Sequence, residues 1–80
     1  MKMKRTYPAI LHEESPGFWA EFPDLVGCQT QGDTLEEIKH NAKEVLEGYL
    51  LTLRDNGEPF PKALDNIETD EIIIMITADI

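Results

Sequence analysis

One cysteine and two histidines are the residues best suited to nucleophilic chemistry or to metal binding. Cys28 and either His12 or His40 would make a nucleophile and its base if the fold placed the thiol beside an imidazole. Cys28, however, falls on the inward side of a predicted strand, where a free cysteine is usually a small buried hydrophobic residue. His40 falls on the polar side of a predicted helix, where a histidine is usually solvated. We therefore predict no catalytic residue among these three, and a zinc site would need more ligands of this kind.

The acidic residues offer a second chemistry, because carboxylates that converge on one divalent cation can cleave a phosphodiester bond. Glu47 on the predicted helix and Asp79 at the end of the last predicted strand are the nearest candidates. The first strand adds no carboxylate, so we predict no metal site. The chain also lacks a P-loop, a dinucleotide-binding glycine fingerprint and a G-x-S-x-G elbow. We expect a protein without enzymatic activity or cofactor, and a residual metal-dependent nuclease is one alternative.

The composition is that of a small acidic globular domain. Its 80 residues, 41% hydrophobic and 29% charged, are enough for one core and too few to divide, so we expect a single domain over residues 1–80. Sixteen acidic residues outnumber seven basic ones, which gives a net charge of −9, and three of the basic residues are Lys2, Lys4 and Arg5. Such a charge repels phosphate backbones and favours a basic protein as partner.

The sequence carries no export or membrane signal. Behind the basic start, Ala9–Leu11 is too short an apolar run for a signal peptide. The longest apolar run, Ile72–Ile76, has five residues, whereas a helix needs about 20 to cross a bilayer. A lone cysteine cannot form an internal disulfide, which fits a reducing compartment. We expect a cytoplasmic protein that binds no membrane.

Three short strands precede a helix in the predicted order of elements. Residues Thr6–Leu11 form the first strand, Phe18–Phe22 the second and Val26–Gln31 the third, with Gly27 allowing a tight return. The second strand alternates, so Phe18, Ala20 and Phe22 are expected to face inward. The three strands predict an antiparallel meander.

The helix is predicted over Leu35–Asp55. Thr34 followed three residues later by Glu37 is a capping box. Apolar residues recur at spacings of three and four along one face, which is expected to pack on the sheet. Asn56-Gly57 supplies a left-handed stop.

The last predicted strand, Glu71–Thr77, is apolar without alternation, a pattern expected when both faces are covered. If Ile72, Ile74 and Ile76 face the helix, then Ile73 and Met75 face the other side, where the chain offers no second layer. A subunit contact in a homo-oligomer, a dimer or tetramer, would cover Ile73 and Met75. Alternatively, both side chains stand half exposed on a small sheet.

The element order predicts an α+β fold, with the last strand beside the first. If these two strands run parallel, the spatial order is 3-2-1-4. Pro8 lacks a backbone N–H and is therefore placed at the beginning of the first strand, before a neighbour reaches it.

Trp19 is expected to stand with Glu21 on the sheet face opposite the helix, near Ile73 and Met75. An exposed tryptophan often marks a protein contact. The alternatives are that Trp19 folds down over its own sheet, or packs under the Pro16-Gly17 turn.

Four segments resemble the HicB antitoxin family: Tyr7–Ile10, Gly17–Cys28, Thr30–Glu37 and Asn41–Leu46. The string FPDL-x-GC-x-T-x-GDT-x-EE is specific, and the resemblance extends from Tyr7 through Pro61. It implies a β-β-β-α-β fold, a partial, degraded ribonuclease H-like fold that has lost its nuclease centre.

The resemblance also implies an antitoxin of a type II toxin-antitoxin system. Proteins of this family typically neutralise a HicA-like toxin, a small basic RNA-cleaving protein, by covering its active surface, and Trp19, Glu21 and Asp24 are the predicted toxin contacts. Many relatives carry a C-terminal DNA-binding domain. This chain ends at Ile80 without one, so we do not expect direct DNA binding. The alternative within the family is an orphan homo-oligomeric binding module whose partner is not a toxin.

Overall fold

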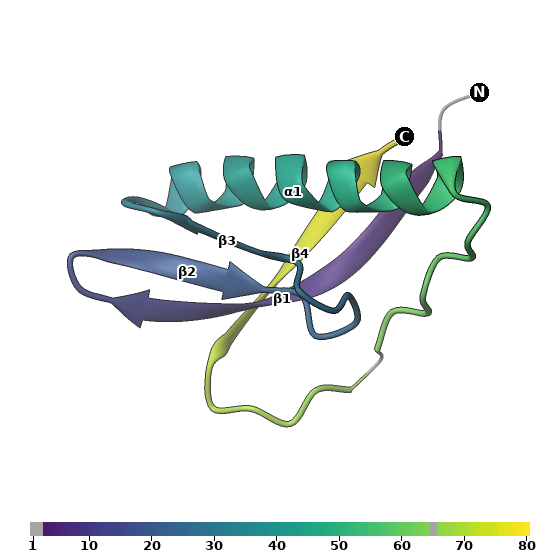
Figure 1. Cartoon of the computed structure of the whole chain (residues 1–80). Helices are drawn as coiled ribbons and strands as arrows, with labels where there is room; N and C mark the ends of the chain where they lie inside the picture. The colour runs from purple at the N-terminus through teal and green to yellow at the C-terminus, as the bar shows by residue number, and fades with distance from the viewer. Residues whose placement is uncertain (1–2, 65) are drawn as a thin grey trace.

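One helix packs on one face of a four-stranded antiparallel sheet in the computed structural model, which describes residues 3–64 and 66–80 (Figure 1). The predicted α+β class is therefore confirmed, while the basic residue Lys2 lies outside the described residues. The elements follow the chain as β1 (Lys4–Glu14), β2 (Gly17–Glu21), β3 (Gln29–Gly32), α1 (Leu35–Asp55) and β4 (Ile72–Asp79).

Helix α1 begins and ends where its local signals place it. The Thr34 hydroxyl accepts a hydrogen bond from the Glu37 backbone N–H at 3.1 Å, which is the first half of the predicted capping box. At the other end Gly57 has a φ of 70°. The N–H of Gly57 donates to Arg54 and that of Glu58 donates to Leu53, the pair of bonds of a Schellman motif. The predicted bounds of α1 are confirmed.

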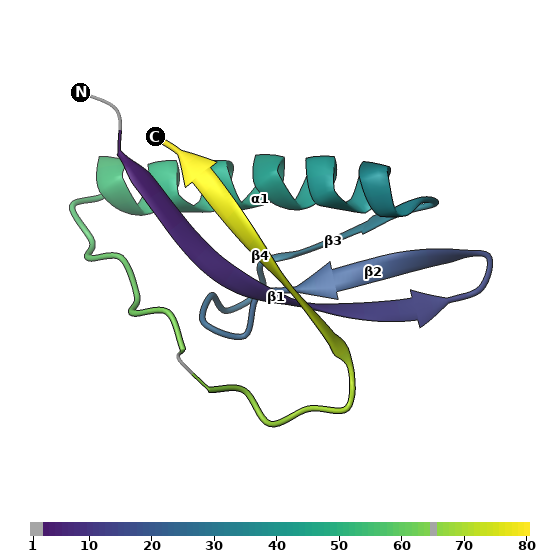
Figure 2. The ribbon, with the colours of Figure 1, turned by 180° about the vertical axis from the view of Figure 1, so that it is seen from behind.

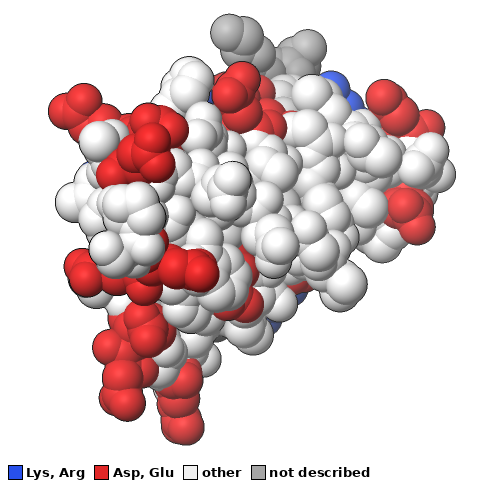
Figure 3. All heavy atoms as spheres, turned by 60° about the vertical axis from the view of Figure 1, so that its left-hand side comes forward, with Lys and Arg blue, Asp and Glu red and all other residues white. Residues whose placement is uncertain are grey.

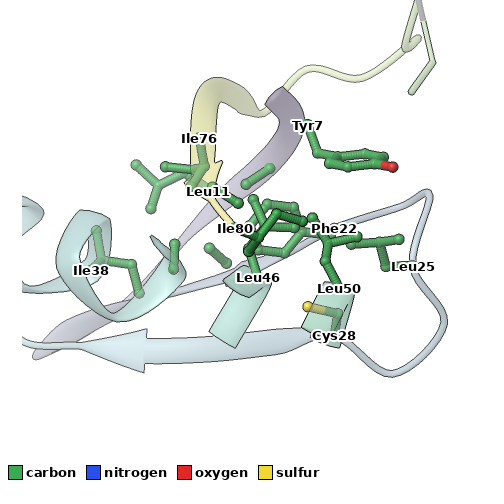
Figure 4. Close-up of a cluster of buried hydrophobic side chains, with 14 residues drawn as sticks. Tyr7, Leu11, Phe22, Leu25, Cys28, Ile38, Leu46, Leu50, Ile76 and Ile80 are labelled. Carbon is green, nitrogen blue, oxygen red and sulfur yellow. The ribbon is translucent and has the colours of Figure 1, made fainter. Parts of the chain in front are cut away.

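The core lies between α1 and the inward face of the sheet (Figure 4). The apolar face of the helix is completely covered at Ile38, Ala42, Leu46 and Leu50. Cys28 is buried in the same cluster, as predicted. Ala20 and Phe22 are buried too, whereas Phe18 near the end of the sheet is only partly covered.

Strand β1 is longer than predicted and lies inside the sheet, between β2 and β4. The prediction that Pro8 begins this strand is wrong, because Pro8 is in the middle of β1 opposite Met75. The register explains why proline is accepted there. Ile80 donates its N–H to Met3, so alternation turns the N–H positions of even-numbered β1 residues away from β4. Pro8 would thus face β2, which has already ended at Glu21, and no ladder donor is needed.

Strand β4 lies beside β1 as expected, and the parallel pairing considered for these two strands is not the one found. The spatial order is β3-β2-β1-β4, and β4 runs antiparallel to β1. Helix α1 ends near the start of β1, where Arg54 donates to the Ile80 carbonyl. The described parts of the connection, residues 56–64 and 66–71, then run back toward the other end of the sheet before β4 begins (Figures 1 and 2). Because of this return, β4 begins beside the second half of β1 and runs back toward the start of β1.

The third and fourth strands differ in detail from the sequence analysis. The third strand begins at Gln29 and not at Val26, which stands 90% exposed in a turn beside Gly27 (φ 78°). Ile72 lies opposite the inward-facing Leu11, on the side of the sheet considered for it, but it is 59% exposed, whereas Ile76 four residues further on is buried. Within the described residues, no helix has both the length and the hydropathy to cross a membrane.

Candidate protein-binding surface

The sheet face opposite α1, called the outer face here, carries side chains from three strands. Strand register places Trp19 opposite His12, and Ile10 between Glu21 and Ile73. The members of the outer face used below are Pro8, Ile10, His12, Trp19, Glu21, Ile73 and Met75. The prediction that Trp19 shares a face with Ile73 and Met75 is confirmed, with β1 lying between them.

The centre of the outer face is an aromatic pair. The Trp19 indole and the His12 imidazole are stacked, with ring centroids 4.1 Å apart and planes 15° from parallel. Trp19 thus folds against its own sheet, as one sequence alternative proposed, and yet keeps part of its surface exposed. Such stacking holds a large apolar side chain in one orientation.

Two carboxylates bracket the imidazole of this pair. His12 Nε2 lies 2.7 Å from Glu21 Oε2, and His12 Nδ1 lies 3.7 Å from Glu71 Oε2. The exposed fractions of the Glu21 and Glu71 side chains are 39% and 49%, so both remain open to a partner. The arrangement presents a flat aromatic surface edged by negative charge.

Trp19 also lines two open grooves. One, of about 510 Å³, runs over β3 and is lined by Glu14, Trp19 and residues 29–31. The other, of about 660 Å³, lies between the β1–β2 turn and the start of α1, with Asp33 and Glu37 among its lining residues. Both grooves carry carboxylates beside the indole, which suits cationic side chains of a partner.

Asp24, the third predicted contact, does not join Trp19 and Glu21 on the outer face. Asp24 lies in the β2–β3 loop, where its Oδ1 accepts the Leu64 N–H at 3.1 Å. Its Oδ2 is buried and has no hydrogen-bond partner among the described residues. Asp24 therefore ties the returning segment to the sheet, and the predicted set divides into two.

Two residues of this surface escaped sequence reasoning. His12 was assigned to a loop because the first strand was expected to end at Leu11, but β1 continues to Glu14. The alternation from Pro8 through Ile10 to His12 was the available signal. Glu71 lies next to His12 because β4 runs antiparallel to β1, which no local pattern revealed.

The residues first considered for nucleophilic catalysis do not come together in the fold. Cys28 is buried in the core, and burial raises the pKa of its thiol to about 11. His40 is on the exposed side of α1, 3.5 Å from Glu44. Neither position pairs the thiol with an imidazole base.

Glu47 and Asp79 do converge, but on an ammonium group. Lys43 Nζ donates to Glu47 Oε2 at 2.7 Å and to Asp79 Oδ2 at 2.8 Å. The hydrogen bond to Asp79, which has the larger effect, and the one to Glu47 both raise the pKa of Lys43. Across residues 3–64 and 66–80, no three histidine, cysteine or acidic side chains are grouped to hold a metal ion.

The distribution of charge agrees with a surface for a basic partner. Acidic side chains stand around the border of the view in Figure 3, and few lysine or arginine side chains are visible there. A net charge of −9 on 80 residues gives the whole molecule a negative field.

Three solved structures of toxin-antitoxin proteins contain a chain with this fold. A chain of a HicA3 and HicB3 toxin-antitoxin complex matches with a TM-score of 0.72 and 26% identity, over 90% of this chain and 95% of that one. A chain of a Streptococcus pneumoniae toxin-antitoxin complex matches with a TM-score of 0.84 and 20% identity, over 96% and 70%. The N-terminal domain of the Burkholderia pseudomallei antitoxin HicB matches with a TM-score of 0.75 and 19% identity, over 95% and 100%. The latter two identities support similarity of fold alone.

Sequence relatives occur in bacteria, an archaeon and a phage. A UPF0150 protein of Synechocystis is 40% identical over 57 residues, 70% of this chain and 72% of its own length. One of Thermoplasma acidophilum is 35% identical over 63 residues, 78% of this chain and 88% of its own length. An uncharacterized 14.9 kDa protein of Haemophilus phage HP1 is 33% identical over 57 residues, 71% of this chain but 43% of its own length.

The family model that describes the HicB-like antitoxin of bacterial toxin-antitoxin systems matches residues 7–76, nearly the whole of the sheet and helix described above. This match agrees with the resemblance seen in the sequence and with the fold of the solved antitoxin chains. The chain belongs to the family of HicB-like antitoxins.

Proposed function

We propose that this chain neutralises a HicA-like, basic, RNA-cleaving toxin by docking on it and covering its active surface. The observation that carries the proposal is the aromatic pair of the outer face, Trp19 on His12, with the Glu21 and Glu71 carboxylates beside it. Partly exposed tryptophans in well-packed surroundings are frequent anchors of protein interfaces.

Charge supports the choice of a basic partner. An RNA-cleaving protein must attract phosphates, so its active surface is positive, and the negative field of this chain would steer the two together. The carboxylates beside Trp19 would meet the cationic side chains that otherwise hold RNA. Occlusion then needs no bond-making chemistry from the antitoxin, which we infer to act in the cytoplasm as a binding protein.

We infer that the fold is a reduced ribonuclease H-like one, as the family resemblance implied. The β-β-β-α-β order supports this inference. Lys43 lies between Glu47 and Asp79, the two carboxylates considered in the sequence analysis as candidate metal ligands. The positive charge of the Lys43 ammonium group would take the place of a metal ion between these carboxylates. Such a substitution accords with a chain that binds and does not cleave.

The test is a titration of toxin activity. A HicA-like toxin would be purified, and its cleavage of RNA measured with increasing amounts of the antitoxin. Cleavage is expected to stop near stoichiometric antitoxin. Undiminished cleavage at a large excess would overturn the proposal and favour a module with another partner.

A matched pair of variants locates the contact. Trp19→Ala should raise the dissociation constant for the toxin by about 30-fold or more, the effect of losing an interface anchor worth about 2 kcal/mol. Leu51→Ala, which removes a side chain of α1 that is 37% exposed, should inhibit like the wild type. Equal inhibition by both variants would place the toxin contact away from the outer face.

A further inference from the structure

Strand β4 is an edge of the sheet, and its outward backbone groups can be identified from the register. Since Ile80 donates its N–H to Met3, the even-numbered residues of β4 direct their N–H and C=O groups toward β1. The odd-numbered residues direct theirs away. Ile73, Met75 and Thr77 therefore present backbone donors and acceptors that no hydrogen bond within the described residues satisfies.

The open part of this edge has a defined end. At Asp79 the outward N–H donates to Glu47 Oε2 of α1 at 2.8 Å, so a ladder could not continue past Thr77. The opposite edge of the sheet is protected in a similar way, because Asn41 of α1 donates to the Gln31 carbonyl of the four-residue strand β3. Side chains of the helix thus bind one outward backbone group on each edge, the Gln31 carbonyl of the short strand β3 and the Asp79 N–H of β4, and leave Ile73–Thr77 of β4 open.

This open stretch also has the apolar side chains that an edge strand usually avoids. From Ile72 to Ala78 it has no charged residue and no proline, the features that normally protect an edge. Of the large hydrophobic residues that stand exposed among those described, three cluster in β4: Ile72 at 59%, Ile73 at 38% and Met75 at 61%. Ile72 lies on one face of the sheet, and Ile73 and Met75 lie on the other. An interface that covers all three side chains therefore includes the edge between the two faces.

We propose that β4 pairs antiparallel with β4 of a second copy, about a two-fold axis at Ile74, to form one continuous eight-stranded sheet. In this register Ile73 lies opposite the partner's Met75 and the two Ile74 residues lie opposite each other. Each copy presents the same edge to the other, as a two-fold interface requires. The backbone supplies the ladder and the apolar side chains supply the burial.

Charge selects this register among those that the backbone allows. With Ile74 on the axis, Glu71 lies opposite Thr77, and every residue from Ile72 to Ile76 lies opposite an apolar one. Placing Met75 on the axis would set Glu71 opposite Asp79, and like charges facing each other destabilise a sheet. Placing Ile73 on the axis would set Glu71 opposite Met75, so that a charged side chain would face an apolar one.

A second copy suits this edge better than the basic toxin does. The open stretch offers an incoming cation no carboxylate, whereas its nearly palindromic apolar sequence complements itself. Trp19 and Glu21 lie on β2, with β1 between them and β4, so dimerisation leaves these two residues accessible to a toxin. Because each copy carries a charge of −9, association should strengthen as salt screens their repulsion.

Sedimentation velocity of the full chain tests the assembly. We expect a dimer whose dissociation constant falls as salt is raised. Met75→Lys should weaken association at least tenfold while circular dichroism shows the same helix content, because Met75 is exposed in the monomer. Leu51→Lys, a matched change on α1, should leave the dimer intact. A wild-type monomer at high salt, or a dimer unaffected by Met75→Lys, would overturn the proposal.

Disulfide formation tests the register separately. Two Ile74 residues on the axis form a non-hydrogen-bonded pair with Cα atoms about 4.5 Å apart, within disulfide range. Ile74→Cys should therefore cross-link in mild oxidant, and Met75→Cys, which lies opposite Ile73, should cross-link far more slowly. The wild-type chain, whose Cys28 is buried, is the control. Faster cross-linking of Met75→Cys would overturn this register.

Discussion

The imidazole of His12 lies flat against the indole of Trp19, with the two ring centroids 4.1 Å apart. The two residues belong to neighbouring strands and lie opposite each other in the register of β1 and β2. Glu21 holds the imidazole from its Nε2 side at 2.7 Å. The indole, the imidazole and the carboxylate therefore form one unit, whose parts should be coupled in energy.

A double-mutant cycle should measure this coupling. We expect His12→Ala and Trp19→Ala each to lower the free energy of unfolding, and the double variant to lose about 1 kcal/mol less than the sum, the size of an aromatic pair. Chemical denaturation of the four proteins is the measurement. A cycle on His40 and Trp19 is the control, since His40 is on α1. Additive losses in the His12 cycle would mean that the stacking contributes no stability.

Two glycines should respond in opposite directions to alanine. A Cβ on Gly32, where β3 approaches α1, would lie 2.9 Å from the Ile38 nitrogen and 3.2 Å from its Cα. These atoms are backbone and cannot move aside, so Gly32→Ala should cost about 1–3 kcal/mol of unfolding free energy. Gly48 lies in the middle of α1, and no atom outside its own helix turn lies within 4 Å of the place that an alanine methyl group would take.

Gly48→Ala should therefore stabilise the protein by about 0.5–1 kcal/mol, because alanine restricts the unfolded chain and favours the helix. Thermal unfolding of both variants checks the pair. A Gly32→Ala protein as stable as the wild type would show that β3 can move away from the helix.

Acid should weaken the contact between α1 and β4. The hydrogen bonds from Lys43 and then from the Asp79 N–H hold the pKa of Glu47 below its ordinary value of 4.5. A carboxyl group whose pKa is lowered by folding stabilises the fold above its unfolded pKa, and this contribution is lost as the pH falls through the folded pKa. Stability should thus decline below pH 4.5, the ordinary Glu value.

The variant Glu47→Gln isolates this contribution. It should lower the unfolding free energy at neutral pH by less than about 1 kcal/mol, since solvent screens an ion pair near the surface. It should also lose part of the decline in acid. Glu44→Gln, whose side chain is 68% exposed beside His40, is the matched control. Denaturation curves from pH 3 to 7, roughly the range over which carboxyl groups titrate, provide the measurement.

Local chemistry determined which elements could be predicted from the sequence. The ends of α1 depend on Thr34 and Gly57, residues that act on their own neighbours in the chain, and both bounds were correct. The direction of β4 depends on the path of the chain between α1 and β4, and no residue next to β4 in the sequence fixes that path. Parallel pairing was considered because a helix commonly returns the chain directly to the next strand.

The candidate surface was predicted in part for the same reason. Alternation in β2 placed Trp19 and Glu21 on the outer face without knowledge of any partner strand. The contribution of His12 required the length of β1, and that of Glu71 required the direction of β4. Asp24 lies apart from Trp19, in the loop after β2, where its carboxylate accepts the Leu64 N–H; its role as a toxin contact stays a prediction.

The thiol of Cys28 should be inert in the folded protein. It is buried between α1 and the sheet, and loss of solvation raises its pKa to about 11 from an ordinary value of 9.0. Since the thiolate is the reactive form, labelling at pH 8 should be slow and should accelerate at least 100-fold in denaturant. A thiol whose pKa is raised by folding stabilises the protein fully below the unfolded pKa, and this part is lost as the pH rises above 9.0.

Labelling with a chromogenic disulfide reagent, followed in water and in denaturant, measures the reactivity of this thiol. Cys28→Ala should lower the unfolding free energy by about 1–2 kcal/mol through the cavity that it leaves. It should also remove the contribution of the thiol to the decline in stability above pH 9.0, the ordinary thiol value. Fast labelling of the folded wild type at pH 8 would contradict a sealed core around Cys28, and with it the packing of Val45, the residue of α1 whose carbonyl lies 3.9 Å from the sulfur.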